Sequence, residues 1–364
     1  MKNKKRVLMV INSPLVNAGV PNVVMNIVRN LCNEFIFDVI TYSNDKGYFE
    51  EEFLSYGGKI YPVSLIEYSE NRIMYGLRGI MLQKAVKKIL IENNYDIIHC
   101  HNGDESGPCL KVAYECGVKI RISHAHGQYK AWSRNPIRIA YFKECLYLIK
   151  KYANVRLACS GLAGDSLFSN QLFDNVLNPI DYDYFHSIRK KEHEGINLLQ
   201  IGYFGMVKNQ LFSLEVMHSL QKRKRNIKLY LIGYNLKGEE NYFEKMKEKI
   251  QEYNLSENVI FLPSDIEKNQ CLDIIDFVLL PSKSEGLSIV AMEAQAAEIP
   301  CLLSRGVPKD VDFGLVKYIE EDAEKWADAI WENRMKQTTL NIKLQDYDIK
   351  KYSSQIGDYY NCVQ

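Results

Sequence analysis

The sequence lacks a cysteine pattern that would indicate a metal site or a disulfide framework. Its nine cysteines include no Cys-x-x-Cys pair, and no cysteines and histidines follow the spacing of a zinc ligand set. Disulfide-rich secreted domains and cysteine-based zinc folds are therefore excluded. We expect free thiols in a reducing cytoplasm.

Long hydrophobic runs are also absent. No stretch reaches the roughly 20 apolar residues that a transmembrane helix needs. The basic start, Met1–Arg6, resembles the head of a signal peptide, but the apolar run behind it, Val7–Ile11, is shorter than a secretory core of roughly 7–15 residues. Asn12 and Pro14 then end the run. We expect a buried first strand and a cytoplasmic protein.

A large excess of charge of one sign is missing as well. The 46 basic and 45 acidic residues leave a net charge of +1, so no global field recruits nucleic acid. A Gly-x-Gly-x-x-Gly loop does not follow the first apolar run, which disfavours a dehydrogenase.

What is present is a regular alternation of short apolar runs and amphipathic stretches over all 364 residues. Continuous apolar runs are typical of parallel strands covered on both faces, and the alternation predicts doubly wound α/β units. The expected strands are Val7–Ile11, Phe37–Tyr42, Ile97–Cys100, Lys119–Ser123, Val155–Cys159, Asn197–Ile201, Lys228–Ile232, Val259–Phe261, Phe277–Leu280 and Cys301–Leu303.

A polar segment that contains proline and glycine, Asn178–Gly195, divides the chain into two halves of ordinary domain size. We therefore predict domains at 1–180 and 181–345.

The most informative segment follows the expected strand Phe277–Leu280. A polar loop carries Glu285 and Gly286, and a helix is expected to begin near Leu287. Helix starts offer unpaired N–H groups to a phosphate, and glycine lets a ligand approach the backbone. Glu293 would lie roughly 9 Å along that helix, so the two carboxylates could contact separate hydroxyl-bearing parts of one ligand. Taken alone, two glutamates at this spacing favour the alternative, in which Glu285 interacts with the helix dipole and Glu293 is a solvated surface residue.

Ser282-x-x-Glu285-Gly-Leu followed by Glu293-Ala-x-Ala-Ala resembles the E-x7-E donor site of glycosyltransferase family 4. The resemblance covers essentially the whole chain. Within that family, the chain is similar to bacterial capsular and exopolysaccharide enzymes. It implies a GT-B fold, an α/β architecture with two Rossmann-like domains facing across a cleft. It also implies a C-terminal helix at 346–364 that crosses back to the first domain, and hinge closure around the donor.

Further segments match the family in order: the first loop around Gly19, the histidine-bearing strand ends His99–His101 and His124–His126, and the loop Gly202–Asn209. The resemblance implies that Lys208 faces the leaving diphosphate, that Glu285 contacts the transferred sugar and that His126 approaches it from the first domain. We expect these three to be catalytic, with no metal required. The donor-binding residues expected are Gly19, Gly202, Asn209, Gly286, Leu287, Ser288 and Glu293. His99 and His101 could instead hydrogen bond to backbone.

The chain departs from the family pattern in three places. Tyr203 stands where the family usually has an arginine that binds the diphosphate together with the lysine. Arg305 is a candidate to replace that arginine. Ala18 precedes Gly19 where paired glycines are common, and Glu298 occupies a turn that often carries glycine.

Residues 129–151 combine six basic residues with interleaved aromatics and one acid. Such a stretch can dock on an anionic membrane surface, at the inner face of the membrane. A helix with its aromatic face in the core and its charges in water is the alternative.

Together these features predict a retaining glycosyltransferase that moves a hexose from a nucleotide sugar, UDP-linked, to a saccharide or lipid-linked acceptor in bacterial surface polysaccharide synthesis. Two alternatives stay open. One is a nucleotide-sugar 2-epimerase-like isomerase of the same architecture, and the other is a non-catalytic sugar-nucleotide-binding scaffold.

Overall fold

The computed structural model describes residues 4–65, 72–129, 135–223, 226–235, 239–264, 266, 269–332 and 342–362. The chain forms two compact units. The first comprises Met1–Pro179 together with Ile349–Gln364, and the second comprises Ile180–Asp348. Each has its own parallel sheet.

The first unit is built on a seven-stranded sheet of order β3-β2-β1-β4-β5-β6-β7. Its central strands are almost entirely buried, as a sheet covered on both faces requires. The strands are β1 (Lys5–Val10), β2 (Phe35–Thr41), β3 (Ile60–Pro62), β4 (Ile97–Cys100), β5 (Ile120–Ala125), β6 (Val155–Ala158) and β7 (Asp174–Asn175).

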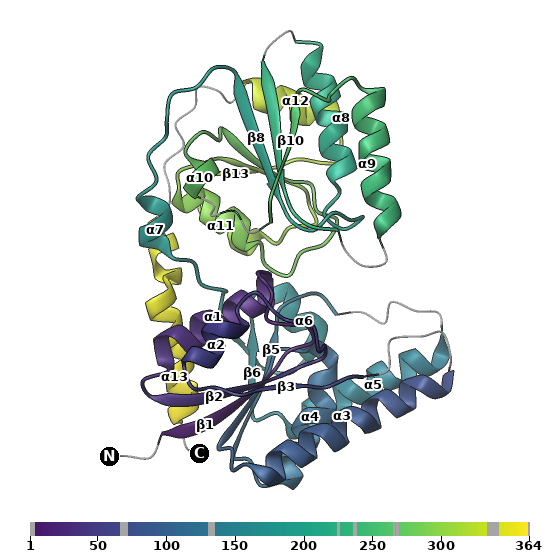
Figure 1. Cartoon of the computed structure of the whole chain (residues 1–364), viewed down its shortest axis with the longest axis vertical. Helices are drawn as coiled ribbons and strands as arrows, with labels where there is room; N and C mark the ends of the chain where they lie inside the picture. Colours follow the sequence, from purple (N-terminus) through teal and green to yellow (C-terminus); the bar gives the residue numbers. More distant parts are fainter. Residues whose placement is uncertain are drawn as a thin grey trace. The chain divides into compact units, whose positions relative to one another are not determined.

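Helices join the strands of the first unit and cover its sheet (Figure 1). They are α1 (Gly19–Leu31), α2 (Glu50–Ser55), α3 (Arg72–Glu92), α4 (Ser106–Glu115), α5 (Pro136–Tyr152) and α6 (Gly161–Phe168), with the 3₁₀ turn η1 (Gly103–Glu105) before α4. The last helix of the chain, α13 (Ile349–Asn361), packs against α1 and buries Tyr352, Ile356 and Tyr360. Both ends of the chain therefore belong to the first unit.

The second unit has a six-stranded parallel sheet of order β10-β9-β8-β11-β12-β13. Its strands are β8 (Ile196–Ile201), β9 (Ile227–Ile232), β10 (Val259–Leu262), β11 (Phe277–Leu280), β12 (Cys301–Leu303) and β13 (Val316–Tyr318). Its helices are α7 (Tyr182–His186), α8 (Gln210–Gln221), α9 (Glu240–Glu252), α10 (Asn269–Leu272), α11 (Ile289–Ala296) and α12 (Ala323–Glu332), with 3₁₀ turns η2 (Lys309–Val311) and η4 (Ile342–Tyr347).

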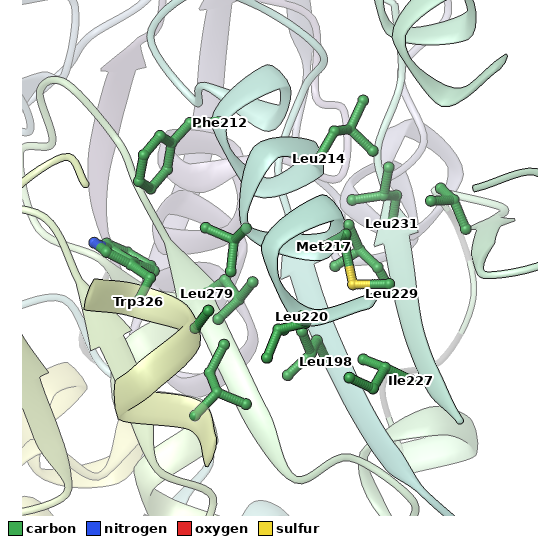
Figure 2. Close-up of a cluster of buried hydrophobic side chains, with 14 of the residues drawn as sticks. Leu198, Phe212, Leu214, Met217, Leu220, Ile227, Leu229, Leu231, Leu279 and Trp326 are labelled. Atoms are coloured by element: carbon green, nitrogen blue, oxygen red, sulfur yellow. The ribbon is translucent and has the colours of Figure 1, made fainter. Parts of the chain in front are cut away.

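The core of the second unit lies between its sheet and helices α8 and α12. Figure 2 shows Met217 and Leu220 of α8 among side chains of the strands, with Trp326 of α12 beside them. Trp326 is fully buried and meets Phe212 edge to face with ring centroids 5.4 Å apart. This packing holds the amino-terminal end of α8 in place above β8, where the candidate site begins.

All ten strands expected from the sequence are present, with bounds that differ by no more than two residues. Three further strands, β3, β7 and β13, lie at sheet edges and were not predicted, because none of them is a continuous apolar run. Among the described residues, no helix is long and apolar enough to cross a membrane.

Candidate functional site

Three loops of the second unit meet at the carboxyl edge of its sheet. They follow β8, β11 and β12, which are neighbours in the sheet. The Lys283 amide donates to the Val207 carbonyl at 2.8 Å, and the Glu285 amide donates to the Gly306 carbonyl at 3.0 Å. The three loops are therefore fixed to one another at the edge where open α/β sheets bind ligands.

Lys208 and Glu285 form an ion pair across two of these loops. The Lys208 Nζ lies 2.6 Å from the Glu285 Oε1, and the two side chains are only 19% and 11% exposed. Both residues were predicted to act on the donor from separate motifs, and the fold brings them into contact. The pair concentrates a cation and a carboxylate, which suits a ligand with phosphate and hydroxyl groups.

Gly202 and Asn209 bracket the loop that carries Lys208. Gly202 has φ +151°, and a Cβ there would lie 3.1 Å from the side-chain carbons of Lys208. Asn209 adopts the left-handed conformation with φ +58° just before α8, a conformation that asparagine tolerates. Its Nδ2 donates to the Glu321 Oε1 at 3.0 Å. Gly202 therefore leaves room for the lysine, and Asn209 anchors the end of the loop.

Buried amides support the same loop and were not predicted. The Gln200 Nε2 donates to the Lys208 carbonyl at 2.7 Å, and the Ser213 hydroxyl donates to the Gln200 Oε1 at 2.7 Å. Gln210 donates to the Tyr203 carbonyl at 2.9 Å. The Glu239 carboxylate accepts from the Met206 amide at 2.7 Å. A glutamine inside an apolar strand, Gln200, is the sequence signal that could have indicated this network.

The helix after the Glu285 loop begins later than predicted. Ser288 is its N-cap and accepts from the Ala291 amide, so α11 starts at Ile289 rather than near Leu287. The cap is favoured there because serine satisfies an unpaired N–H of the first turn. Glu293 consequently lies about 6 Å, not 9 Å, along the helix. Its side chain is buried within the unit, which disfavours the alternative of a solvated surface charge. Gly286 and Leu287 belong to the loop that leads into this helix start.

Tyr203, in the place of the expected arginine, lies beside the ion pair. The Lys208 Nζ is 5.9 Å from the centre of its ring. Burial first, and then the carboxylates of Glu239 and Glu285, raise the pKa of Tyr203 to about 12. Tyr203 is therefore a neutral phenol at physiological pH and can donate a hydrogen bond without adding positive charge.

Glu298 has φ +58° at the position where the related pattern carries glycine. It follows the end of α11, where a left-handed residue commonly closes a helix. The turn is therefore retained with a side chain that disfavours it. Arg305, the candidate substitute for the missing arginine, is exposed in the loop after β12.

The two site residues expected in the first unit lie at the carboxyl edge of its own sheet. Gly19 is the exposed first residue of α1, and nothing lies within 4 Å of where its Cβ would be. His126 follows β5 and is partly exposed. Its Nε2 is 2.8 Å from the Nδ1 of His101. Burial lowers the pKa of His126 to about 4, so its imidazole is neutral at pH 7.

Among the described residues, no backbone group hydrogen bonds to the rings of His99 and His101, contrary to the alternative that the sequence left open. Instead they bond to His124, His126 and Tyr360. Of the basic segment 129–151, residues 130–134 lie outside the described residues, so Lys130, Trp132 and Arg134 are not placed.

Residues 183–324 match the family model described as "Glycosyl transferases group 1". This range contains Lys208, Glu285 and Glu293. Over these residues the chain is similar to a glycosyltransferase group 1 domain. The matched domain spans the three loops and most of the second unit.

Two curated relatives extend the similarity beyond the group 1 domain. EpsF of Bacillus subtilis (strain 168), named as a glycosyltransferase, is 28% identical over 355 residues, which cover 90% of this chain and 87% of EpsF. The capsular polysaccharide biosynthesis glycosyltransferase CapH of Staphylococcus aureus is 27% identical over 279 residues, covering 74% of this chain and 73% of CapH.

Solved structures share the fold at low identity. HepE of Anabaena in complex with UDP has a TM-score of 0.77 at 14% identity, covering 98% of this chain and 99% of that chain. The lipopolysaccharide outer core galactosyltransferase WaaB has a TM-score of 0.68 at 16% identity, covering 97% of this chain and 98% of that chain. With two parallel-sheet α/β units, the predicted GT-B fold class is confirmed.

Proposed function

We propose that the chain is a retaining glycosyltransferase of family 4. In this proposal it transfers a hexose from a UDP-linked nucleotide sugar to a saccharide or lipid-linked acceptor in bacterial surface polysaccharide synthesis. The observation that carries the proposal is the Lys208–Glu285 ion pair, which joins two motif loops inside the group 1 domain.

The ion pair fits a donor with a diphosphate and a sugar. A diphosphate entering this edge of the sheet offers Lys208 a stronger partner than one carboxylate. Glu285 is then released to accept hydrogen bonds from sugar hydroxyls. In the unliganded chain the pair holds both side chains near the positions they need, which lowers the cost of ordering them on binding.

Charge on the leaving diphosphate is balanced by groups of the protein. Lys208 supplies a cation, the start of α11 supplies backbone amides and the positive end of a helix dipole, and Tyr203 supplies a neutral O–H. Gly286, Leu287 and Ser288 lie at that helix start. In the proposed mechanism the diphosphate departs first, the acceptor attacks the same face, and no metal is required. Glu293 accepts hydrogen bonds from the ribose.

The nucleotide and the pathway are inferred from relatives. HepE has been crystallised with UDP, with UDP and glucose, and with UDP-glucose. CapH is named for capsular polysaccharide biosynthesis. These names favour a UDP-sugar and a polysaccharide acceptor for this chain.

Peripheral docking on an anionic membrane is part of the same proposal. On α5, Cys145, Leu148 and Ile149 face the core. Tyr147 is 54% exposed and lies one helical turn from Lys143, Lys150 and Lys151, which are exposed as well. An exposed aromatic ring with three lysines and one acid, Glu144, within a helical turn favours an interfacial helix over one whose aromatic residues all face the core.

A donor-binding and turnover experiment tests the proposal. Thermal shifts are measured with UDP-, GDP- and ADP-sugars for the wild type, Glu293→Ala and Glu285→Gln, with Glu324→Gln on the exposed surface of α12 as the matched control. We expect a saturating shift with a UDP-sugar that Glu293→Ala loses and Glu324→Gln keeps. With that donor, Lys208→Ala should lower the rate of sugar transfer about 10²–10³-fold.

Different outcomes separate the alternatives. Conversion of the nucleotide sugar into an isomeric nucleotide sugar without any acceptor would indicate an isomerase. Donor binding with no turnover on any saccharide or lipid-linked acceptor would indicate a scaffold. The absence of a shift with every nucleotide sugar would contradict the proposal at its first step.

A further inference from the structure

Four histidines gather at the carboxyl ends of two adjacent strands in the first unit. His99 and His124 lie in β4 and β5, and His101 and His126 follow the ends of these strands. The alternating spacing puts all four side chains on one face of the sheet. His99, His101 and His124 are buried, and His126 is partly exposed. Four of the seven histidines of the chain are therefore concentrated in one place.

Hydrogen bonds within the cluster leave ring nitrogens without partners. The His99 Nδ1 is 2.7 Å from the Tyr360 hydroxyl, and the His99 Nε2 is 3.2 Å from the His124 Nδ1. The His101 Nδ1 is 2.8 Å from the His126 Nε2. Among the described residues, no partner reaches the buried His101 Nε2 or His124 Nε2. Buried polar atoms nearly always have a hydrogen-bond or ligand partner, so these two nitrogens are candidates to bind a ligand.

We infer that His99, His101 and His124 form a binding site for one divalent transition-metal ion of the zinc type. One ring nitrogen from each of the three lies within 4.8 Å of the others. The 3.2 Å separation of the His99 Nε2 and the His124 Nδ1 is close to the roughly 3.3 Å expected for two nitrogens about 2.0–2.1 Å from one tetrahedral zinc ion. The inference concerns the first unit and does not depend on the proposed transfer reaction.

The hydrogen bonds behind the rings suit metal binding. A neutral imidazole has one protonated and one unprotonated ring nitrogen, and the unprotonated one binds the metal. Each imidazole can keep its one proton on the nitrogen that does not bind the metal. His99 then donates from Nδ1 to Tyr360, and His101 donates from Nδ1 to His126. Metal-binding histidines usually have such an acceptor behind them, and here the fold already supplies two.

The ligand set also selects the class of ion. Three imidazoles without a carboxylate disfavour magnesium and calcium, which prefer oxygen ligands, and suit zinc, cobalt or nickel. A fourth position filled by water is common in three-histidine zinc sites, and such a water ionises near pH 7. A bound hydroxide would halve the charge that the site buries. The partly exposed His126 beside His101 marks the side from which an ion and water could enter.

Metal content and Co²⁺ spectroscopy test the inference on the full chain, purified without a polyhistidine tag and stripped with a chelator. We expect about one equivalent of Zn²⁺ to bind and to raise the melting temperature. Bound Co²⁺ should give the strong visible absorption of a tetrahedral nitrogen site. Wild-type protein that takes up neither ion, or that binds them without this absorption, would overturn the inference and leave the cluster with ordered water only.

Variants locate the bound ion. His99→Asn, His101→Asn and His124→Asn should each weaken Zn²⁺ binding at least about 100-fold, and Tyr360→Phe about 10-fold, because the latter removes only the acceptor behind His99. His186→Asn in the second unit is the matched control and should bind as the wild type does. Equal affinity in His99→Asn, His124→Asn and His186→Asn would place the ion elsewhere and refute the site.

Discussion

At the scale of single residues, the candidate donor site depends on groups that are held before any ligand arrives. Lys208 and Glu285 are paired at 2.6 Å, and Gly202 and Gln200 fix the loop that carries the lysine. Tyr203 stays neutral beside them because burial raises its pKa. In the proposed function, the site binds a charged donor by exchanging this internal ion pair for contacts with the ligand.

Glu298 provides a first prediction at this scale. Its φ of +58° strains a residue with a side chain by about 1–2 kcal/mol, and a glycine would relieve that strain at an entropic cost of about 0.5–1 kcal/mol. Glu298→Gly should therefore stabilise the second unit by up to about 1 kcal/mol, as measured by urea unfolding. Glu298→Ala keeps the Cβ and should give no such gain. Equal stabilisation by both changes would show that the charge matters and the backbone does not.

Asp104 provides a second prediction, on pH dependence. Burial, followed by the neighbouring charge of Glu105, raises the pKa of Asp104 from 3.8 to about 6. Its carboxyl group therefore favours the folded state below about pH 4, and this contribution is lost as the pH rises through about 6. Asp104→Asn should stabilise the first unit at pH 7.5 by up to about 3 kcal/mol and hardly at all at pH 4.

Denaturant unfolding at the two pH values measures this difference. Asp165→Asn, at an exposed position of α6, is the control and should change little at either pH. A stabilisation by Asp104→Asn that is the same at pH 4 and pH 7.5 would contradict the assignment.

At the scale of elements, α5 combines a buried apolar face with an exposed side that carries three lysines, Tyr147 and one acid, Glu144. We expect Lys143→Glu with Lys150→Glu to weaken binding to vesicles of anionic phospholipid by at least about 30-fold, because each lysine near such a surface contributes about 1 kcal/mol. Co-sedimentation with the vesicles measures the effect. Lys245→Glu with Lys247→Glu, on α9 of the second unit, makes the same charge change and should bind normally if α5 is the docking element.

At the scale of the whole molecule, the chain ends in the unit where it began. Helix α13 packs on α1, and the Tyr360 hydroxyl reaches His99. Ending the chain after Asp348 would remove the buried side chains of Tyr352, Ile356 and Tyr360, which contribute roughly 5 kcal/mol or more. We expect the first unit to unfold in this variant while the second unit remains folded.

Limited proteolysis and circular dichroism distinguish the two units in that experiment. Protected fragments should come from 180–348 alone. Ending the chain after Asn361 instead retains every buried residue of α13 and serves as the control. A first unit that stays protected without α13 would show that the sheet and the remaining helices are sufficient.

Much of the fold could be predicted from the sequence, because its signals are local. Continuous apolar runs such as Val7–Ile11 and Phe277–Leu280 overlap strands β1 and β11, since a parallel strand covered on both faces is mostly apolar. Shorter edge strands such as Asp174–Asn175 carry no such pattern, and they form only because a neighbouring strand offers hydrogen bonds. Helix α11 starts at Ile289, later than predicted, because Ser288 caps it. Hydrophobic periodicity does not resolve which of several adjacent positions becomes the cap.

The sequence by itself determined the residue types of the candidate site and the order of its motifs. It also indicated that these motifs lie together, because loops that follow parallel strands gather at one edge of the sheet. Only the tertiary structure decided which side chains meet. Lys208 and Glu285 are 77 positions apart and touch because β8 and β11 are neighbours in the sheet. The histidine pairs likewise meet because β4 and β5 are adjacent, and Tyr360 joins His99 across 261 positions because α13 returns to the first unit. Such contacts depend on sheet order and helix packing, which no single segment of the chain encodes.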